Sequence, residues 1–354
     1  MTPTVIDTYM AAAPAPEKTK LTPSAIHRYL DQYVIGQDEA KRALSVVVYT
    51  HFKNAHYQKL STDENRTSHL AMGKSNVLLV GPTGTGKTLL CDTLSRAINV
   101  PFVTADATSL AQTKFMNEEI ESILQRLLNK ADGNLARAER GIVFIDEIDK
   151  LKAAGSEVRS TSGESVQHAL LKIMEGSLVK LANNVAIDTT NIMFICGGAF
   201  VGLDQIVKHS KAYGFISVAE NNNQKILDRL NSRIKPTDLM SFGLIPEFTG
   251  RLPVVASLAP LTQAMLVSIM TVPKNCLYNQ FRDVFKREGV ELTIEARVFD
   301  EIASLAVEYK VGARSLRGIF EEMIAPVLFA IPDQPDVKTV LIRSLFEDAE
   351  MAAG

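Results

Sequence analysis

The sequence is poor in cysteine. Its 354 residues include only three, Cys91, Cys196 and Cys276, which lie far apart and never form a C-x-x-C pair. That spacing argues against a zinc module and against a disulfide framework. We therefore expect no zinc, and we interpret each cysteine, which stands among apolar neighbours, as a small core residue.

Long apolar runs and net charge are missing as well. No apolar run approaches the ~20 residues needed to cross a bilayer, and the N-terminus lacks the charged-then-apolar order of a signal peptide. The net charge is −2 with acids and bases interspersed, which gives no electrostatic signature of nucleic-acid or membrane binding. We therefore expect a cytoplasmic protein with no nucleic acid and no membrane among its partners.

One glycine-rich motif dominates the chain. It reads G-P-T-G-T-G-K-T, follows the apolar run 77–80, precedes a helical pattern over 89–98, and matches the P-loop pattern. The glycines let successive backbone N–H groups and the positive end of the helix face one anion. Lys87 would reach the β- and γ-phosphates, and the Thr88 hydroxyl would ligate Mg²⁺. The alternative is a glycine-rich turn without a ligand. The nucleotide-binding residues that the motif predicts are Gly81, Pro82, Thr83, Gly84, Thr85, Gly86, Lys87, Thr88 and Leu89.

A second apolar run, 142–145, ends in two carboxylates, Asp146 and Glu147. An acid at the carboxyl end of a buried strand downstream of a P-loop is placed to help hold Mg²⁺, so we assign Asp146 to the metal together with Thr88. Glu147 suits the general base that polarises an attacking water. The alternative is a strand that simply ends in solvated acids.

The remaining pattern predicts an α/β fold of two domains. Apolar strands alternate with helices, which indicates a parallel sheet with helices on both faces. From about residue 260 the pattern changes to long helices, 263–287, 296–309 and 315–329, around two short strands. We expect loops at 105–116 and 153–165. The predicted division is a flexible leader (1–20), a large ATPase domain (21–259), a smaller, mainly helical α/β domain (260–345) and a flexible tail (346–354).

From Leu21 to about Leu345 the chain resembles the ClpX family of AAA+ protein unfoldases. The stretches that carry the resemblance keep the same order and similar spacing; they are 33–37, 73–76, the P-loop, 141–150, 194–200, 242–253 and 312–314. The resemblance implies a homo-hexameric ring that hydrolyses ATP to ADP and phosphate between neighbouring subunits. It also implies loops that pull protein substrates through a central pore.

The resemblance assigns further residues to the nucleotide. Val34 and Ile35 would contact adenine, Arg251 would be a catalytic arginine finger beside Lys87 and Glu147 of a neighbour, and Arg314 would be the sensor-2 arginine. An arginine supplied by the next subunit can contribute about 10³ to 10⁵ in rate. Without the resemblance we would favour a surface ion pair with Glu247 for Arg251.

Several substrate-facing parts depart from the family. The N-terminal zinc-binding domain is missing, and the first pore loop has Phe115 and Met116 without their flanking glycines. The alternative for Phe115 is packing under the loop. The tripeptide that docks the ClpP peptidase appears as Tyr213, Gly214 and Phe215. We expect an ATP-driven unfoldase that works with a Clp peptidase or as a peptidase-independent remodeller or mixed-ring regulatory subunit. A nucleic-acid-directed AAA+ ATPase is disfavoured by the neutral charge.

Overall fold

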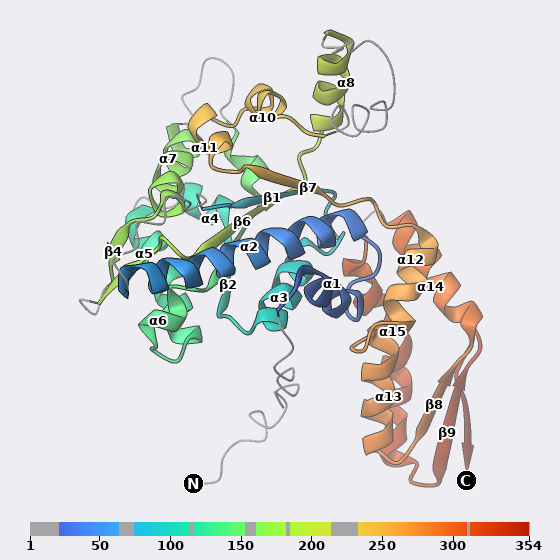
Figure 1. Cartoon of the computed structure of the whole chain (residues 1–354). Helices are drawn as coiled ribbons and strands as arrows, with labels where there is room; N and C mark the ends of the chain where they lie inside the picture. The colour runs from blue at the N-terminus through green and yellow to red at the C-terminus, as the bar shows by residue number, and fades with distance from the viewer. Residues whose placement is uncertain are drawn as a thin grey trace.

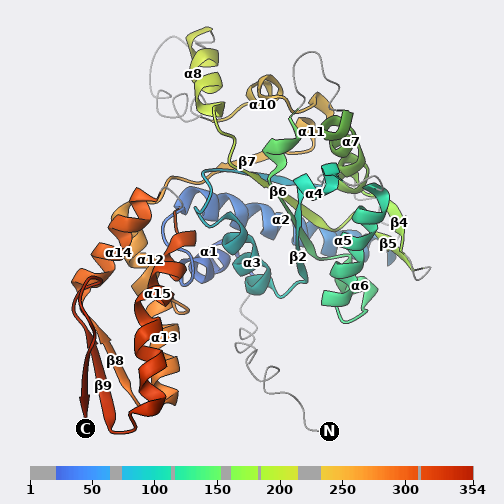
Figure 2. The ribbon, with the colours of Figure 1, turned by 180° about the vertical axis from the view of Figure 1, so that it is seen from behind.

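The computed structural model describes residues 21–63, 74–112, 116–152, 161–181, 185–213, 233–309 and 312–353. Within this part of the chain no helix is long and apolar enough to cross a membrane. Two bodies are visible: a sheet covered by helices, and a smaller unit at one end that holds α12 to α15 and the last strands (Figures 1 and 2).

A five-stranded parallel sheet forms the centre of the large domain. Its order is β2-β3-β6-β1-β7, so the P-loop strand β1 lies between β6 and β7. The strands are short, and β1 and β3 correspond to the apolar runs from which the sequence predicts strands. Their bounds are β1 Val77–Val80, β2 Phe102–Asp106, β3 Ile142–Asp146, β6 Met193–Gly198 and β7 Val254–Ser257.

Alternate residues of the strands face opposite layers of helices, as the pleat requires. Leu79, Phe144 and Ile195 pack with α1, α2 and α3, whereas their neighbours in sequence pack with α4, α5 and α7. Both faces of the sheet are therefore buried, which confirms the predicted α/β architecture. The helices of the two layers are α1 Pro23–Asp31, α2 Asp38–Asp63, α3 Lys87–Ile98, α4 Ala107–Gln112, α5 Met116–Lys130 and α7 Thr161–Glu175.

Shorter elements complete the large domain. β4 and β5 form an antiparallel hairpin that follows α7. The other elements are α6 Leu135–Ala138, η2 Ile148–Leu151, β4 Leu178–Lys180, β5 Ala186–Asp188, α8 Leu203–Tyr213, α10 Pro236–Phe242 and α11 Pro246–Gly250.

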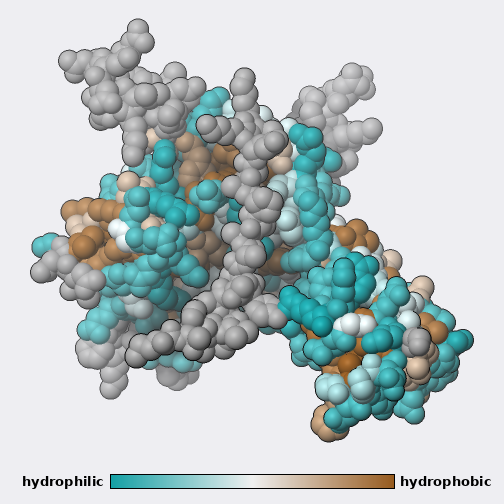
Figure 3. All heavy atoms as spheres, turned by 90° about the horizontal axis from the view of Figure 1, so that it is seen from below, coloured by the Kyte–Doolittle hydropathy of each residue, from teal (hydrophilic) through white to brown (hydrophobic). Residues whose placement is uncertain are grey.

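The small domain has its own core and a three-stranded sheet of order β10-β9-β8. Viewed from below, it lies at the lower right and exposes mainly hydrophilic residues (Figure 3). Its elements are α12 Gln263–Thr271, α13 Leu277–Arg287, β8 Glu291–Ile294, α14 Ala296–Glu308, α15 Arg314–Ala330, η3 Ile331–Asp333, β9 Val337–Ile342 and β10 Glu350–Ala353.

Three sequence predictions were wrong in detail, two in the large domain and one in the small domain. The expected loop 105–116 contains α4, which begins where Asp106 Oδ1 accepts the backbone N–H of Thr108 at 2.7 Å. Helix α7 begins at Thr161, inside the expected loop 153–165. The single helix expected over 263–287 is two helices, because Pro273 lies between them and cannot continue a helix.

The flexible tail expected at 346–354 was also wrong. It contains β10, which pairs antiparallel with β9, and Arg343 forms an ion pair of 3.0 Å with Glu350 across this hairpin. The tail therefore extends the sheet of the small domain.

Candidate nucleotide-binding site

The P-loop joins β1 to α3 in a conformation that depends on its glycines. Gly84 and Gly86 have φ of +80° and +92°, a region that side chains disfavour. A Cβ at Gly81 would lie 2.8 Å from the carbonyl oxygen of Leu258, so this position has no room for a side chain. No side chain caps the start of α3 at Gly86. The first N–H groups of α3 therefore need another acceptor, and an anion suits them.

Lys87 is the buried cation of the loop. Its side chain is 7% exposed, and Nζ donates to the carbonyls of Gly81 at 2.7 Å and Pro82 at 3.0 Å. Burial lowers the pKa of Lys87, while the carboxylate of Asp146 raises it. The lysine is thus held inside the loop, next to the acidic end of β3.

Oxygen groups gather where α3 meets the end of β3. Thr88 Oγ1 donates to Asp146 Oδ2 at 3.5 Å, and Asp146 Oδ1 accepts the backbone N–H of Glu147 at 2.9 Å. Glu147 has φ of +59°, so the chain turns sharply directly after the strand. A cavity of about 510 Å³ borders Thr88 and Asp146. Carboxylate and hydroxyl oxygens are the ligands that Mg²⁺ prefers, and these residues fit that cation.

The small domain contacts the P-loop. The backbone N–H of Ala313 donates to Gly84 O at 3.4 Å, and a Cβ at Gly312 would lie 3.2 Å from Thr83 O. Arg314 begins α15 at this point. Burial is the main cause of the lowered pKa of Lys87, and the positive charge of Arg314 lowers that pKa further. A cleft of about 210 Å³ lies between the P-loop and residues of the small domain such as Leu266 and Val307.

The segment that contains Val34 and Ile35 is tied to the connection between the domains. Val34 is buried with α1 and α2, and Ile35 is half-buried. Gln37 is 7% exposed; its Nε2 donates to Ala259 O at 2.9 Å, and its Oε1 accepts the Ala259 N–H at 2.8 Å. Gln37 belongs to the stretch 33–37 that carries the resemblance, but no role was predicted for it from the sequence.

Arg251 lies away from the P-loop of its own chain. Its carbonyl accepts a hydrogen bond of 3.2 Å from Asn76, which precedes β1, whereas the P-loop follows β1. The four residues of β1 lie between Asn76 and Gly81, and five steps along an extended strand place these two residues roughly 16 Å apart. The guanidinium forms an ion pair of 2.6 Å with Glu175, so the alternative partner expected from the sequence, Glu247, was wrong.

Comparison with known proteins decides the family. The AAA domain (Cdc48 subfamily) matches residues 73–255, and the C-terminal, D2-small domain, of ClpB protein matches residues 261–339. The ATP-dependent Clp protease ATP-binding subunit ClpX 3 of Methylococcus capsulatus is 44% identical over 342 residues, which cover 90% of this chain and 79% of that protein. The chain belongs to the ClpX family.

Other ClpX relatives agree. ClpX of Bacteroides thetaiotaomicron is 45% identical over 88% of this chain and 78% of its own length. ClpX of Treponema denticola is 43% identical over 91% of this chain and 80% of its own length. The AAA domain and these relatives identify an ATPase, and they support the predicted ATP-driven protein unfoldase.

The parts of this ClpX-family chain that would face substrate and peptidase are only partly described. Phe115, Gly214 and Phe215 lie outside the described residues. Met116 begins α5 and Tyr213 ends α8. The pore and docking roles of these residues stay predictions.

Asp149 is a site residue that the sequence analysis missed. It is buried in η2, and its carboxylate accepts the backbone N–H groups of Ala199 at 3.3 Å and Phe200 at 3.2 Å. A Cβ at Gly198 would lie 2.5 Å from Asp149 Oδ1. Asp149 therefore fixes the loop after β6 against the turn after β3. The sequence feature that could have indicated this role is the position of Asp149 three residues after Asp146.

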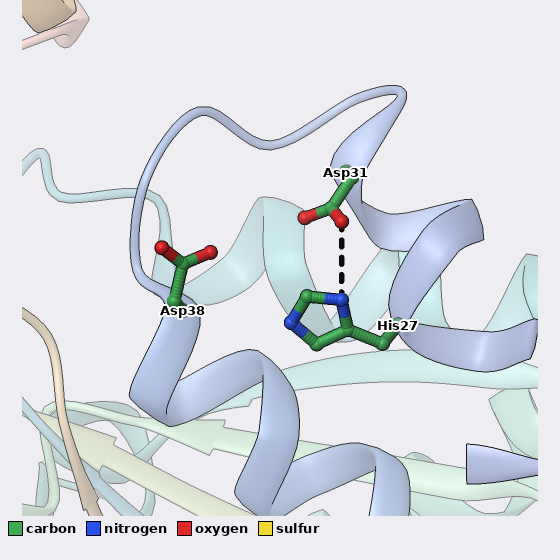
Figure 4. A group of neighbouring side chains, drawn as sticks. All are labelled: His27, Asp31 and Asp38. Carbon is green, nitrogen blue, oxygen red and sulfur yellow. Dashed lines mark ion pairs between the residues drawn. The ribbon is translucent and has the colours of Figure 1, made fainter. Parts of the chain in front are cut away.

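Among the described residues, His27, Asp31 and Asp38 could present ligand atoms to a metal ion within 4.8 Å of one another (Figure 4). His27 Nδ1 lies 3.0 Å from Asp31. Lys41 already supplies a cation there, with Nζ at 2.7 Å from Asp31 and 3.9 Å from Asp38. We interpret this group as an ion-pair network that joins α1 to α2.

Proposed function

We propose that six copies of this chain form a ring that binds ATP between neighbours and pulls protein substrates through its pore. The observation that carries the ring is the position of Arg251, at the opposite end of β1 from the P-loop. An arginine finger has to reach the phosphates to neutralise transition-state charge, a contribution of about 10³ to 10⁵ in rate. Arg251 therefore serves the site of a neighbouring copy.

Each remaining residue has a separate task in one site. The P-loop N–H groups and Lys87 bind the phosphates, and Val34 and Ile35 contact adenine. Thr88 and Asp146 hold Mg²⁺, which when bound neutralises charge on the phosphates. Glu147 accepts a hydrogen bond from the attacking water and so positions it, which phosphoryl transfer to water requires, and it then takes the proton of that water as the general base.

The small domain would transmit the state of the bound nucleotide to the rest of the ring through its orientation. Gly312 and Ala313 contact the P-loop directly, and Arg314 follows them at the start of α15. A charged group that binds the triphosphate from this domain changes the angle between the domains when the phosphate leaves. Such a change would move the loops that grip substrate, for which we propose Phe115 and Met116.

A second candidate is a remodeller that does not deliver substrates to a peptidase. The observation that favours it is Tyr213, which stands where the resemblance implies the isoleucine of a peptidase-docking tripeptide. A phenol ring is larger and carries a polar end, so it fits an aliphatic pocket poorly. A mixed ring with another ClpX remains the third form. We expect all three to act in the cytoplasm.

The test measures ATP hydrolysis together with unfolding of a fluorescent protein that carries candidate tags, with and without ClpP. Loss of fluorescence followed by degradation supports an unfoldase that delivers to ClpP. Loss of fluorescence without degradation supports the stand-alone remodeller. Hydrolysis with no unfolding of any tagged protein, alone or in mixture with another ClpX, contradicts the proposal.

A further inference from the structure

The C-terminal end of α7 is held by side chains that the nucleotide site does not use. The last carbonyls of a helix have no partner within the helix, so they need donors from elsewhere. Ile173 O accepts Thr189 Oγ1 at 2.8 Å and Lys74 Nζ at 3.4 Å. Lys74 also donates to Thr189 O at 2.7 Å. These bonds fix the last turn of α7, which ends at Glu175.

The amide of Asn76 joins this helix end to Arg251. Its Nδ2 donates to Met174 O at 3.3 Å and to Arg251 O at 3.2 Å, and its Oδ1 accepts the Phe194 N–H at 3.4 Å. Asn76 is 1% exposed, so a lost bond here would leave a buried polar group unpaired. One amide thus holds the residue before Glu175 and the backbone of Arg251 at a fixed separation.

Between these two fixed backbones the side chains meet. Arg251 Nη2 lies 2.6 Å from Glu175 Oε1, and the side chains are 52% and 46% exposed. The contact uses one nitrogen of the guanidinium, which has five N–H donors in a planar fork. The remaining donors stay available for phosphate oxygens, while the carboxylate restricts the rotamers of a long side chain.

We propose that Glu175 is a positioning residue for Arg251, and that Lys74 and Asn76 hold the two backbones that make the pair. The inference rests on the proposed role of Arg251 as a finger for a neighbouring site. Glu175 touches no part of the nucleotide site of its own chain among the contacts of the described residues. Its effect should therefore appear in turnover and not in ATP binding.

The experiment compares Glu175→Gln with the assembled wild-type protein. We expect turnover at saturating ATP to fall about two- to fivefold, the range of a partly exposed ion pair, with unchanged affinity for a fluorescent ATP analogue. Glu175→Asp keeps the charge and should recover part of the loss. Glu321→Gln is the matched control, because Glu321 forms a 2.7 Å pair with Arg317 on α15 at similar exposure. It should turn over ATP as the wild type does.

Single-turnover hydrolysis in an Arg251→Ala background makes the test specific. If Glu175 acts through Arg251, adding Glu175→Gln there changes the rate by less than about 1.5-fold. A further two- to fivefold loss in that background, or wild-type turnover of Glu175→Gln alone, would overturn the inference. If Arg251→Ala alone hydrolysed ATP at the wild-type rate, Arg251 would not be an arginine finger, and the proposed function would fail. That result comes from the single variant, so it is distinguishable from a failure of the role given to Glu175.

Discussion

Gln37 and Ala259, far apart in the sequence, exchange two hydrogen bonds. The amide of Gln37 donates to the Ala259 carbonyl at 2.9 Å and accepts the Ala259 N–H at 2.8 Å. Leu258, the preceding residue, donates its N–H to Val80 O at 2.7 Å and contacts Gly81. The segment before α2 is therefore fixed to the connection between the domains, directly beside the P-loop.

This pairing makes Gln37→Ala a test of the segment. The change removes two partly buried hydrogen bonds to the backbone of Ala259; because Ala259 itself is exposed and water can replace them, we expect a cost of about 0.5–1.5 kcal/mol for each bond. We expect a lower free energy of unfolding and weaker ATP binding. Urea unfolding and nucleotide titration measure both, with Gln32→Ala, an exposed position on the same segment, as the control. Unchanged ATP affinity would show that the segment does not shape the nucleotide site.

Glycine at position 312 allows the small domain to approach the P-loop. Gly312 has φ of +67°, and a Cβ would lie 3.2 Å from Thr83 O. We expect Gly312→Ala to destabilise the protein by roughly 1 kcal/mol and to raise the KM for ATP, because backbone strain and contact both push the domains apart.

Gly318, on the helix α15 that follows Gly312, provides the opposite control. A Cβ there meets nothing within 4 Å, and the residue lies inside α15. Gly318→Ala should stabilise the protein by about 0.5–1 kcal/mol and leave the KM for ATP unchanged. Equal KM values for the two variants would contradict the role given to Gly312.

Lys74 predicts a pH dependence of stability. Burial lowers the pKa of Lys74 to about 7, and Asp188 offsets only part of that effect. In the unfolded chain the pKa of a lysine is about 10.4, so between pH 7 and 10 the unfolded state binds more protons. Stability from this residue therefore increases as the pH rises through that window.

The measurement is the free energy of unfolding in urea at pH values from about 6.5 to 9.5. The difference between the wild type and Lys74→Met should grow in favour of the wild type with increasing pH. Lys172→Met, at an exposed position of α7, controls for the loss of a positive charge. A difference that stays constant across the range would show that Lys74 stays protonated in the folded protein.

Glu147→Gln tests the general base. The amide keeps the size and the half-buried position of the side chain but cannot accept a proton from water. We expect ATP to bind with wild-type affinity and to remain unhydrolysed, with a rate loss of at least about 10². Rapid separation of bound nucleotide after mixing measures this, and turnover near the wild-type value would disprove the assignment.

The sequence predicted the features that depend on short stretches of chain. Strands β1 and β3 coincide with apolar runs, and the P-loop is a glycine-rich motif that ends in Lys87 and Thr88. The carboxyl ends of β1 and β3 meet at one edge of the parallel sheet, so Thr88 and Asp146 were expected close together. Thr88 Oγ1 lies 3.5 Å from Asp146 Oδ2.

Long-range pairings could not be predicted in this way. Sequence spacing favoured Glu247 for Arg251, four residues away, but the fold brings Glu175 to it from the end of α7. The role of Asp149 could not be predicted from its position after a strand, because its partner, the backbone N–H of Phe200, comes from the distant loop after β6. Strand β10 depends on β9 for its hydrogen bonds, so the local sequence pattern did not predict it.

The most direct test of the account mixes two inactive variants. Lys87→Ala lacks the lysine of the P-loop, and Arg251→Ala lacks the guanidinium that we assign to a neighbour's site. In mixed assemblies, an intact P-loop can meet an intact Arg251 from the adjacent copy. The account predicts that each variant alone hydrolyses ATP at least about 10³-fold more slowly than the wild type, and that mixing restores a measurable fraction of activity. No recovery, in mixtures shown to contain both variants in one assembly, would contradict a finger supplied between subunits.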